Sequence, residues 1–445
     1  MGTQKISLTD RYDLEKSPVL LNGTQALVRL TMMQAARDKA AGLNTAGYVT
    51  GYRGSPLGAV DLQMDRAAKT LAAHNVVFEP GLNEDLAATA LWGSQQAELR
   101  GEGKYDGVFG LWYGKGPGVD RSGDVMRHAN MAGSSVNGGV LMAMGDDHTG
   151  ESSTVLHQSE WAMVDAYMPV VSPAGVQEIL DYGIYGWALS RFSGLWVGLK
   201  TMKDTVEATS VVNGDPNRMK LVTPQFDMPD GGLNIRLQDT PHLQEARMID
   251  YKRFAAEAFS HANKMDKRMW GKSGAKIGIA AAGKNWLDVI HAMSLLNIDE
   301  NEAERLGITL YKIGQTFPLD MKGFHSWAEG LDLVIVVEEK RKLIEVQIKE
   351  ALFSDTHRRV YGWHKGGGAG MEHGEELFPT RGALDPIWIA EKLGGIFIEE
   401  GRTTDGIKAG MEALDTARRA DNAEDIAARV PYFCSGCPHN SSTRL

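Results

Sequence analysis

The sequence predicts an α/β fold made of two doubly wound domains, each built around a parallel sheet. Short apolar runs with the character of buried strands alternate with longer segments of helical periodicity, and turns containing glycine or proline separate them. One irregular, proline-containing stretch interrupts this alternation near the middle of the chain. With 445 residues, 43% of them hydrophobic, the chain can form two or three hydrophobic cores.

The first domain is expected at residues 1–212. After an irregular start, a helix is expected at residues 24–41, and strands at residues 45–50, 76–78, 107–113, 139–144, 170–171 and 195–199. Helices at about residues 56–73, 83–100, 118–132 and 175–191 connect these strands. Because strands and helices of these lengths alternate, the strands should form one parallel sheet with helices on both faces.

Residues 213–274 are expected to link the two domains. Four prolines and a Gly-Gly pair mark an irregular stretch, and a charged helix is expected at residues 242–269, with no long strand. The second domain is expected at residues 275–400, with strands at 276–282, 308–313 and 333–338 and helices at about 286–296, 341–352 and 386–393. A helix at about residues 404–419 opens the last segment, 401–445.

The composition argues against several classes of protein. A formal net charge of −10 disfavours a nucleic-acid surface or binding to an anionic membrane. No apolar run approaches the roughly 20 residues that span a membrane. Two cysteines are too few for a disulfide framework and suit a reducing compartment. We therefore expect a cytoplasmic protein that binds small molecules and protein partners, with no nucleic acid and no membrane among them.

Polar residues follow four of the predicted strands. Ser55 lies in the turn after the strand at 45–50, Glu84 after the strand at 76–78, and Lys115 after the strand at 107–113. Asp146 and Asp147 follow the strand at 139–144. The carboxyl ends of parallel strands meet at one edge of a sheet, where α/β proteins bind their ligands. We therefore expect these side chains to share one rim.

Glu84 is the carboxylate at the start of the predicted helix on this rim. Asn83 has the character of a helix N-cap, and Glu84 and Asp85 suit the first helical turn. An acid in this position most often complements the helix dipole at the surface, and this simpler interpretation is the alternative. The strand-to-helix junction and the polar neighbours favour a role in binding or catalysis.

Cys434 and Cys437 form a C-x-x-C pair near the end of the chain. This spacing lets both thiolates reach one metal ion or iron–sulfur cluster. A redox dithiol, or half of a zinc site with His439, is compatible with the same spacing. Another set of metal-ligand types, which lacks a regular spacing, comprises Asp147, His148, Glu151 and His157.

The ordered set of motifs resembles a known family. Y-R-G-S-P at residues 52–56, N-E-D-L-A at 83–87, G-K-G-P-G-V-D at 114–120 and G-D-D-H-T-G-E-S-S at 145–153 are similar to the pyrimidine-binding domain of the thiamine-diphosphate-dependent 2-oxoacid:ferredoxin oxidoreductases. The indolepyruvate ferredoxin oxidoreductase branch matches best. Later landmarks of the same branch are V-V-E-E-K-R at 336–341, L-F-P at 377–379 and F-C-S-G-C-P-H-N at 433–440.

The resemblance implies a domain order and a reaction. The second domain resembles the transketolase C-terminal-like domain that follows the pyrimidine-binding domain in this family. The reaction is the oxidative decarboxylation of a 2-oxo acid, an arylpyruvate such as indolepyruvate, to an acyl-coenzyme A, with electrons passed to ferredoxin. Glu84 would hydrogen-bond ring nitrogen N1′ of thiamine diphosphate and so activate the cofactor. The residues implied at the cofactor are Glu84, Ser55, Lys115 and Asp120, and those implied at the substrate are Ser55, Arg53 and Asp147.

The last segment resembles the start of the family's diphosphate-binding domain. There the C-x-G-C motif, Cys434 and Cys437 in this sequence, supplies two ligands of a 4Fe-4S cluster. No later cysteine follows, and the G-D-G motif that holds the diphosphate through Mg²⁺ is absent. We therefore expect the sequence to be the N-terminal part of a longer polypeptide, which completes the Mg²⁺ and cluster sites, and we expect a homodimer or larger oligomer.

Two other functions are compatible with these residues. A non-oxidative thiamine-diphosphate enzyme, such as a 2-oxoacid decarboxylase or a transketolase relative, would share Glu84 without needing the cluster. A non-catalytic assembly subunit would keep the fold without using Glu84. Loss of activity on changing Glu84 separates this last function from the other two.

Overall fold

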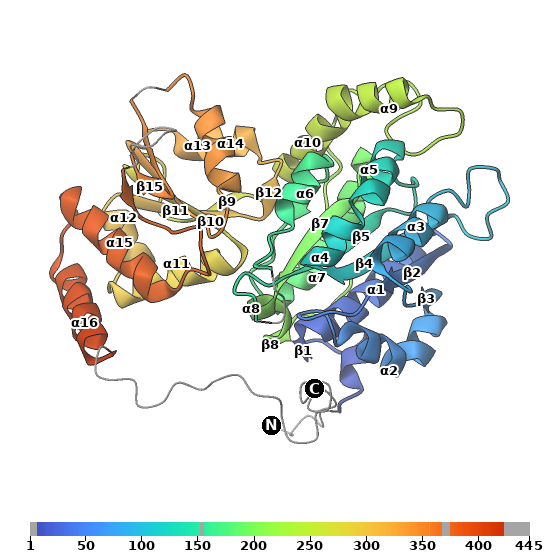
Figure 1. Ribbon diagram of the computed structural model, residues 1–445, viewed down its shortest axis with the longest axis horizontal. Coiled ribbons are helices and arrows are strands. Elements are labelled where there is room, and N and C mark those ends of the chain that lie inside the picture. The colour runs from blue at the N-terminus through green and yellow to red at the C-terminus, as the bar shows by residue number, and fades with distance from the viewer. Residues whose placement is uncertain (1–6, 152–154, 356, 367–373, 422–445) are drawn as a thin grey trace, which may run out of the picture.

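The computed structural model describes residues 7–151, 155–355, 357–366 and 374–421. Two α/β domains lie next to one another, and most strands in each run parallel (Figure 1). The predicted fold class is therefore confirmed. Among the described residues, no helix combines the length and the apolar character needed to cross a membrane.

The sheet of the first domain has seven strands in the order β12-β6-β7-β5-β4-β2-β3. The strands are β2 (Thr45–Gly51), β3 (Val76–Phe78), β4 (Gly107–Lys115), β5 (Val140–Asp146), β6 (Val170–Val171), β7 (Val197–Met202) and β12 (Gln315–Phe317). All neighbouring pairs are parallel except β12 and β6, which are antiparallel. β12 comes from the sequence of the second domain, so that domain supplies an edge strand to the sheet of the first.

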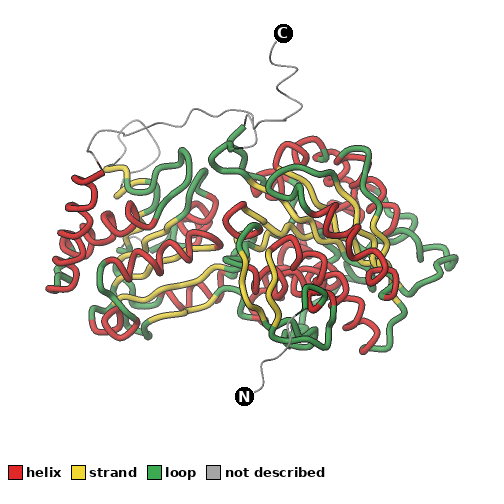
Figure 2. Tube along the Cα trace, turned by 90° about the horizontal axis from the view of Figure 1, so that it is seen from below, coloured by secondary structure: helices red, strands yellow, loops and turns green. Residues whose placement is uncertain are grey.

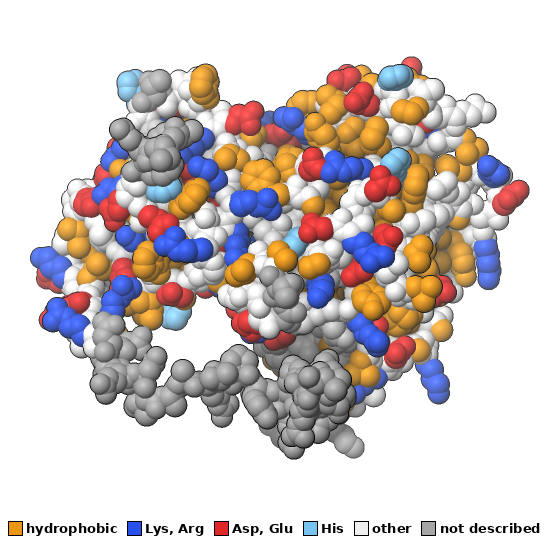
Figure 3. All heavy atoms as spheres, in the orientation of Figure 1, with side chains coloured by type: hydrophobic (Ala, Val, Ile, Leu, Met, Phe, Trp, Pro, Cys, Tyr) orange, Lys and Arg blue, Asp and Glu red, His pale blue; other side chains and the backbone are white. Residues whose placement is uncertain are grey.

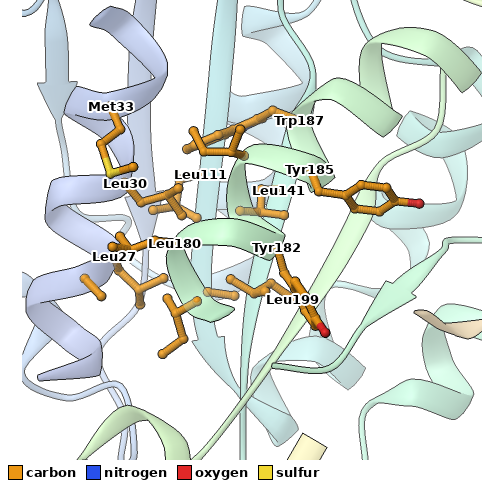
Figure 4. Packing of buried hydrophobic residues seen from close by; sticks show 14 of the residues in the cluster. Leu27, Leu30, Met33, Leu111, Leu141, Leu180, Tyr182, Tyr185, Trp187 and Leu199 are labelled. Carbon is orange, nitrogen blue, oxygen red and sulfur yellow. The ribbon is translucent and has the colours of Figure 1, made fainter. Parts of the chain in front are cut away.

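Helices cover both faces of this sheet because side chains alternate along each strand. One face packs against α1 (Gly23–Ala40), α2 (Val60–Ala73) and α7 (Val176–Ser193). The other face packs against α3 (Glu84–Ser94), α5 (Gly123–Ala132) and α6 (Glu160–Asp165). Figure 4 shows the first of these cores, in which Leu30 of α1 and Leu180 of α7 meet Leu111 and Leu141 of the strands.

The N-terminal segment is more regular than predicted. A 3₁₀ turn at Asp10–Tyr12 precedes β1 (Val19–Asn22), which pairs antiparallel with β8 (Thr209–Val212) after the short helix α8 (Lys203–Val206). The buried guanidinium of Arg29 holds this segment by donating to main-chain carbonyl groups of residues 10, 11, 13, 16 and 214. A strand of four residues with one distant partner leaves no periodic signal in the sequence.

The predicted linker helix is divided in the structure. Its parts are α9 (Pro241–Arg247), a π-helical turn (Met248–Lys252) and α10 (Arg253–Asn263). Lys264 then adopts a left-handed conformation, with φ of 52°, and ends α10. The next residues form β9 (Lys267–Trp270), an antiparallel edge strand in the sheet of the second domain. No long strand was expected in this segment, and the four residues of β9 lie where the sequence predicted the end of the charged helix, because charged residues on a short edge strand resemble the end of a polar helix.

The second domain has a five-stranded sheet in the order β14-β13-β10-β11-β9. Its other strands are β10 (Ile277–Ala282), β11 (Ile308–Ile313), β13 (Leu333–Val337) and β14 (Arg359–Tyr361). One face packs against α11 (Gly283–Leu295), α12 (Glu300–Arg305), α15 (Pro386–Glu399) and α16 (Asp405–Asp421), and the other against α13 (Met321–Ala328) and α14 (Leu343–Ala351). A small hairpin joins β15 (His364–Lys365) to β16 (Glu375–Glu376). Figure 2 shows the two sheets with helices on both sides.

Lys252 fastens the segment between the domains to the first domain. Its side chain is fully buried, and Nζ lies 3.3, 3.2 and 3.3 Å from the carbonyl oxygens of Asn130, Met131 and Gly194. Burial lowers the pKa of this amine from 10.5 to about 7. The unfolded chain therefore binds more protons than the folded chain between these two pH values, and the stability from Lys252 grows as the pH rises.

We predict a pH-dependent stability difference for Lys252→Met. The free energy of unfolding of the wild type, relative to the variant, should rise by about 2 kcal/mol between pH 7 and pH 9, as the linkage relation requires. Urea unfolding at both pH values measures this difference. The exposed Lys322 offers a control, because Lys322→Met should give a difference that does not change with pH. A constant difference for Lys252→Met would contradict the prediction.

Candidate functional site

The predicted rim lies where the carboxyl ends of four neighbouring strands meet. In the sheet, β4 lies between β2 and β5, and β3 lies on the far side of β2. The register pairs Gly51 with Tyr113 and Lys115 with Gly145, so these strands end at nearly the same level. The segments that follow them carry Ser55, Glu84, Lys115 and Asp146.

Glu84 is the first residue of α3, and two hydrogen bonds fix its position. The side chain of Asn83 caps the helix by accepting from the main-chain N–H of Leu86 at 2.9 Å. Trp112 Nε1 of β4 donates to the carbonyl oxygen of Glu84 at 3.1 Å. The side chain of Glu84 is half-buried, and in the described part of the chain its carboxylate has no hydrogen bond or ion pair. A fixed carboxylate without a partner is available to a ligand.

Two glycines of the segment after β4 allow close contacts that a side chain would prevent. A Cβ atom on Gly118 would lie 2.4 Å from Cγ of Glu84, and one on Gly116 would lie 2.2 Å from Nδ1 of His157. Both residues are buried and belong to the short helix α4 (Gly116–Arg121). The glycines therefore bring α4 against Glu84 on one side and His157 on the other.

The other predicted site residues differ in their surroundings. Ser55 and Arg53 are exposed, and Gly54 between them lies against the aliphatic part of Lys115, where a Cβ atom would be 2.9 Å from Cδ. Asp120 is exposed and close to His157, as described below. Asp147 is buried, and its Oδ1 accepts from the main-chain N–H groups of residues 150 and 151 at 2.9 and 3.1 Å. The structure thus brings Ser55, Lys115 and Glu84 to one rim, and uses Asp147 to shape the segment after β5.

The sequence did not reveal the part played by His157 and Asp146. His157 Nε2 lies 2.8 Å from Oδ2 of Asp120, and Nδ1 lies 3.5 Å from Oδ1 of Asp146. Burial opposes a charge on His157, but the two carboxylates raise its pKa above the ordinary value. Asp146 is fully buried, yet His157 and Lys200 hold the pKa of its carboxyl below the ordinary value. A polar segment without periodicity gives no signal of such a contact.

A second polar contact joins the two domains at the same rim. His148 Nδ1 lies 2.5 Å from Oε1 of Glu339, which follows β13. The other oxygen of Glu339 accepts from Asn285 Nδ2 at 3.2 Å and from the main-chain N–H of Leu384 at 2.9 Å. Despite burial, His148 and Lys284 hold the pKa of Glu339 well below its ordinary value. This carboxylate is thus a charged link between the domains.

The remaining metal-ligand candidates do not form a cluster in the structure. Among the described residues, no group of three or more His, Cys, Asp or Glu side chains is arranged to hold a metal ion. His148 binds Glu339, and Glu151 pairs with Lys203. Cys434 and Cys437 lie outside the described residues.

The fold is that of a two-domain α/β protein, and the carboxyl ends of its first sheet form the candidate ligand site. The indolepyruvate oxidoreductase domain matches residues 267–421. The chain is 26% identical over 443 residues to the indolepyruvate oxidoreductase subunit IorA of Pyrococcus abyssi, and 23% identical over 447 residues to that of Pyrococcus horikoshii. Each alignment covers 97% of this chain and 59% of the relative. The chain therefore spans about three fifths of the length of these curated relatives.

A solved structure shares the fold. The 2-oxoglutarate:ferredoxin oxidoreductase from Magnetococcus marinus superimposes with a TM-score of 0.56 and 15% sequence identity, covering 87% of this chain and 66% of that one. These similarities confirm the predicted resemblance: the indolepyruvate oxidoreductase domain matches part of the chain, and the named subunits resemble it over 97% of its length.

We predict that Gly118→Ala displaces Glu84. Restoring an ordinary contact of 3.4 Å from the present 2.4 Å requires a shift of about 1 Å, which the Glu84 side chain can make more easily than the backbone. A crystal structure of the variant should show the Glu84 carboxylate moved and the sheet unchanged. Gly123→Ala is the matched control, because nothing lies within 4 Å of its added Cβ atom. An unmoved Glu84 in Gly118→Ala would show that α4 does not position it.

Proposed function

We propose that this chain supplies the cofactor-activating half of a thiamine-diphosphate site in an enzyme that oxidatively decarboxylates a 2-oxo acid. The unpartnered carboxylate of Glu84 at the rim is the observation that carries the proposal. Two kinds of relative support it. The curated relatives are named as indolepyruvate oxidoreductase subunits. The Magnetococcus marinus oxidoreductase was solved with 2-oxoglutarate, coenzyme A and succinyl-CoA bound.

The residues at the rim fit the aminopyrimidine part of the cofactor. A half-buried carboxylate that no described residue engages can hydrogen-bond a ring nitrogen, and the small α4 glycines leave Glu84 room beside the sheet. Thiamine diphosphate, when bound, supplies the electron sink for cleavage of the bond between the keto carbon and the carboxylate of a 2-oxo acid. The chain's own part is to hold and move one proton at N1′ through Glu84.

The other rim residues have binding roles in this proposal. Lys115, whose side chain lies against Gly54, would attract an anionic group of cofactor or substrate, and the hydroxyl of Ser55 would donate to it. Asp120 would act at the cofactor, and Arg53 and Asp147 at the substrate. The hydrogen bond from Trp112 Nε1 of β4 to the carbonyl oxygen of Glu84 keeps the Glu84 backbone in place while the side chain exchanges its proton.

The electron and acyl acceptors follow from the same proposal. Cys434 and Cys437 would provide two thiolates to a 4Fe-4S cluster, through which electrons pass singly to ferredoxin. Coenzyme A would accept the acyl group, and Mg²⁺ would hold the diphosphate of the cofactor. We further propose an arylpyruvate as the 2-oxo acid, and a homodimer or larger oligomer as the working assembly.

The proposal predicts that Glu84→Gln slows cofactor activation in the holoenzyme. Glutamine keeps the shape of the side chain but cannot transfer the proton, so deuterium exchange at C2 of the thiazolium ring should fall by at least about 10²-fold, the usual scale for one acid–base group. Cofactor affinity and the fold should change much less. NMR of the quenched exchange reaction measures the rate directly.

Asp85→Asn provides the control for this experiment. The carboxylate of Asp85 pairs with Arg121 at 2.7 Å, whereas the side chain of Glu84 lies against Gly118. Exchange in Asp85→Asn should therefore stay close to the wild-type rate. If Glu84→Gln exchanged deuterium at C2 as fast as the wild type, the proposed site would be refuted. Glu84 would then be an acid that only complements the dipole of α3.

A further inference from the structure

An open groove of about 920 Å³ runs between the two domains and borders the Glu84 rim at α4, where Val119 and Asp120 line it. We call it the interdomain groove. On the side of the first domain it is lined by α4, α5 and α6, with Met126, Leu156 and Trp161 among its apolar residues. On the side of the second domain it is lined by Lys340 and Arg341, which follow β13, and by residues 380–382. Figure 3 shows hydrophobic and basic side chains together on the face where the domains meet.

The backbone at Lys340 is in an unfavourable conformation. Its φ angle is 64°, in the left-handed region that residues other than Gly, Asn and Asp rarely adopt. Such conformations persist where the surrounding structure fixes them, and they gather at binding sites. The neighbouring contacts explain what fixes it: Glu339 is held by His148 and Asn285, and the main-chain N–H of Arg341 donates to Gln158 at 3.1 Å.

The side chain of Lys340 is buried without a partner. It is 7% exposed, and within the described residues its ammonium group makes no hydrogen bond or ion pair. The acids that act on it electrostatically, Asp146, Asp147 and Glu339, are each bound to other donors. Burial lowers the pKa of Lys340, and the nearby carboxylates of Glu339, Asp147 and Asp146 offset this effect only in part.

The other cations of the groove are already engaged. Its three arginines have partners in the pairs Arg127–Asp165, Arg341–Gln158 and Arg381–Glu376. The guanidinium of Arg341 also lies over the ring of Trp161, 5.5 Å from its centre. Among the described lysines and arginines that line the groove, Lys340 is therefore the one available to a ligand.

We propose that the interdomain groove binds a small organic anion, whose carboxylate or phosphate group pairs with Lys340 and whose apolar part lies against Trp161 and Met126. An anion there would give the ammonium group of Lys340 a charge-assisted hydrogen bond, which no described residue provides. The apolar lining beside it suits a ligand with a hydrophobic body. The groove shares Asp120 with the proposed cofactor site, but Lys340 is not part of that site, so the inference goes beyond the function proposed above.

Titration calorimetry on the chain without cofactor tests this site with two probes, phenylpyruvate and inorganic pyrophosphate. We expect at least one of them to bind, and Lys340→Met to weaken that binding by about tenfold or more, the scale of a charge-assisted hydrogen bond. Methionine keeps the length of the stem and the same backbone requirement, so only the charge is lost. Lys340→Arg should keep most of the affinity, and Lys340→Gln should repeat the loss.

Lys342→Met is the matched control. Lys342 lies two residues further along, outside the groove lining, with its ammonium group over the ring of Trp363. This variant should bind like the wild type. If Lys340→Met loses binding of phenylpyruvate but not of pyrophosphate, the site binds carboxylates. If it loses binding of pyrophosphate but not of phenylpyruvate, the site binds phosphates. If it loses binding of both probes, the site accepts either anion. The proposal is overturned if the wild-type protein binds neither probe at millimolar concentration. It is also overturned if Lys340→Met binds the probes as tightly as the wild type does.

Discussion

The buried carboxylate of Asp146 connects three parts of the molecule at the end of β5. It accepts hydrogen bonds from the main-chain N–H and hydroxyl of Ser159, the residue before α6. It also faces His157, which lies against α4, and His148, which reaches the second domain. Removing one partner from a buried charged group commonly costs about 3–5 kcal/mol, because the remaining charge has no water to replace it. The rim and the domain interface therefore both depend on the charge interactions and hydrogen bonds around Asp146.

Local patterns in the sequence were sufficient to place the rim. The apolar runs identified β2, β3, β4 and β5 to within two residues, and Asn83 marked the start of α3 correctly. The same patterns placed Glu84 at a strand-to-helix junction. Such features are encoded within a few residues of one another, so strand and helix periodicity is enough to find them.

Contacts between distant parts of the chain could not be predicted in this way. His148 and Glu339 are 191 positions apart, and no local sequence pattern around either residue indicates the contact with the other. β9 and β12 are short edge strands whose pairing partners lie elsewhere in the sequence. The glycines of the segment after β4 suggest a turn, whereas Gly116 and Gly118 are needed for close approach to His157 and Glu84. These features depend on tertiary packing, which the periodicity of a single segment of sequence does not predict.

The place of β12 has a consequence for the order in which the protein folds during synthesis. β6 lies at the edge of the first sheet until residues 315–317 pair with it. A ribosome that has completed the first 212 residues has therefore released a sheet with an open edge, and about a hundred more residues, several seconds of translation, must follow before that edge is closed. Exposed strand edges are sites of mispairing between chains. The newly made first domain would be most prone to aggregation during that interval, and it becomes protected only when the second domain emerges.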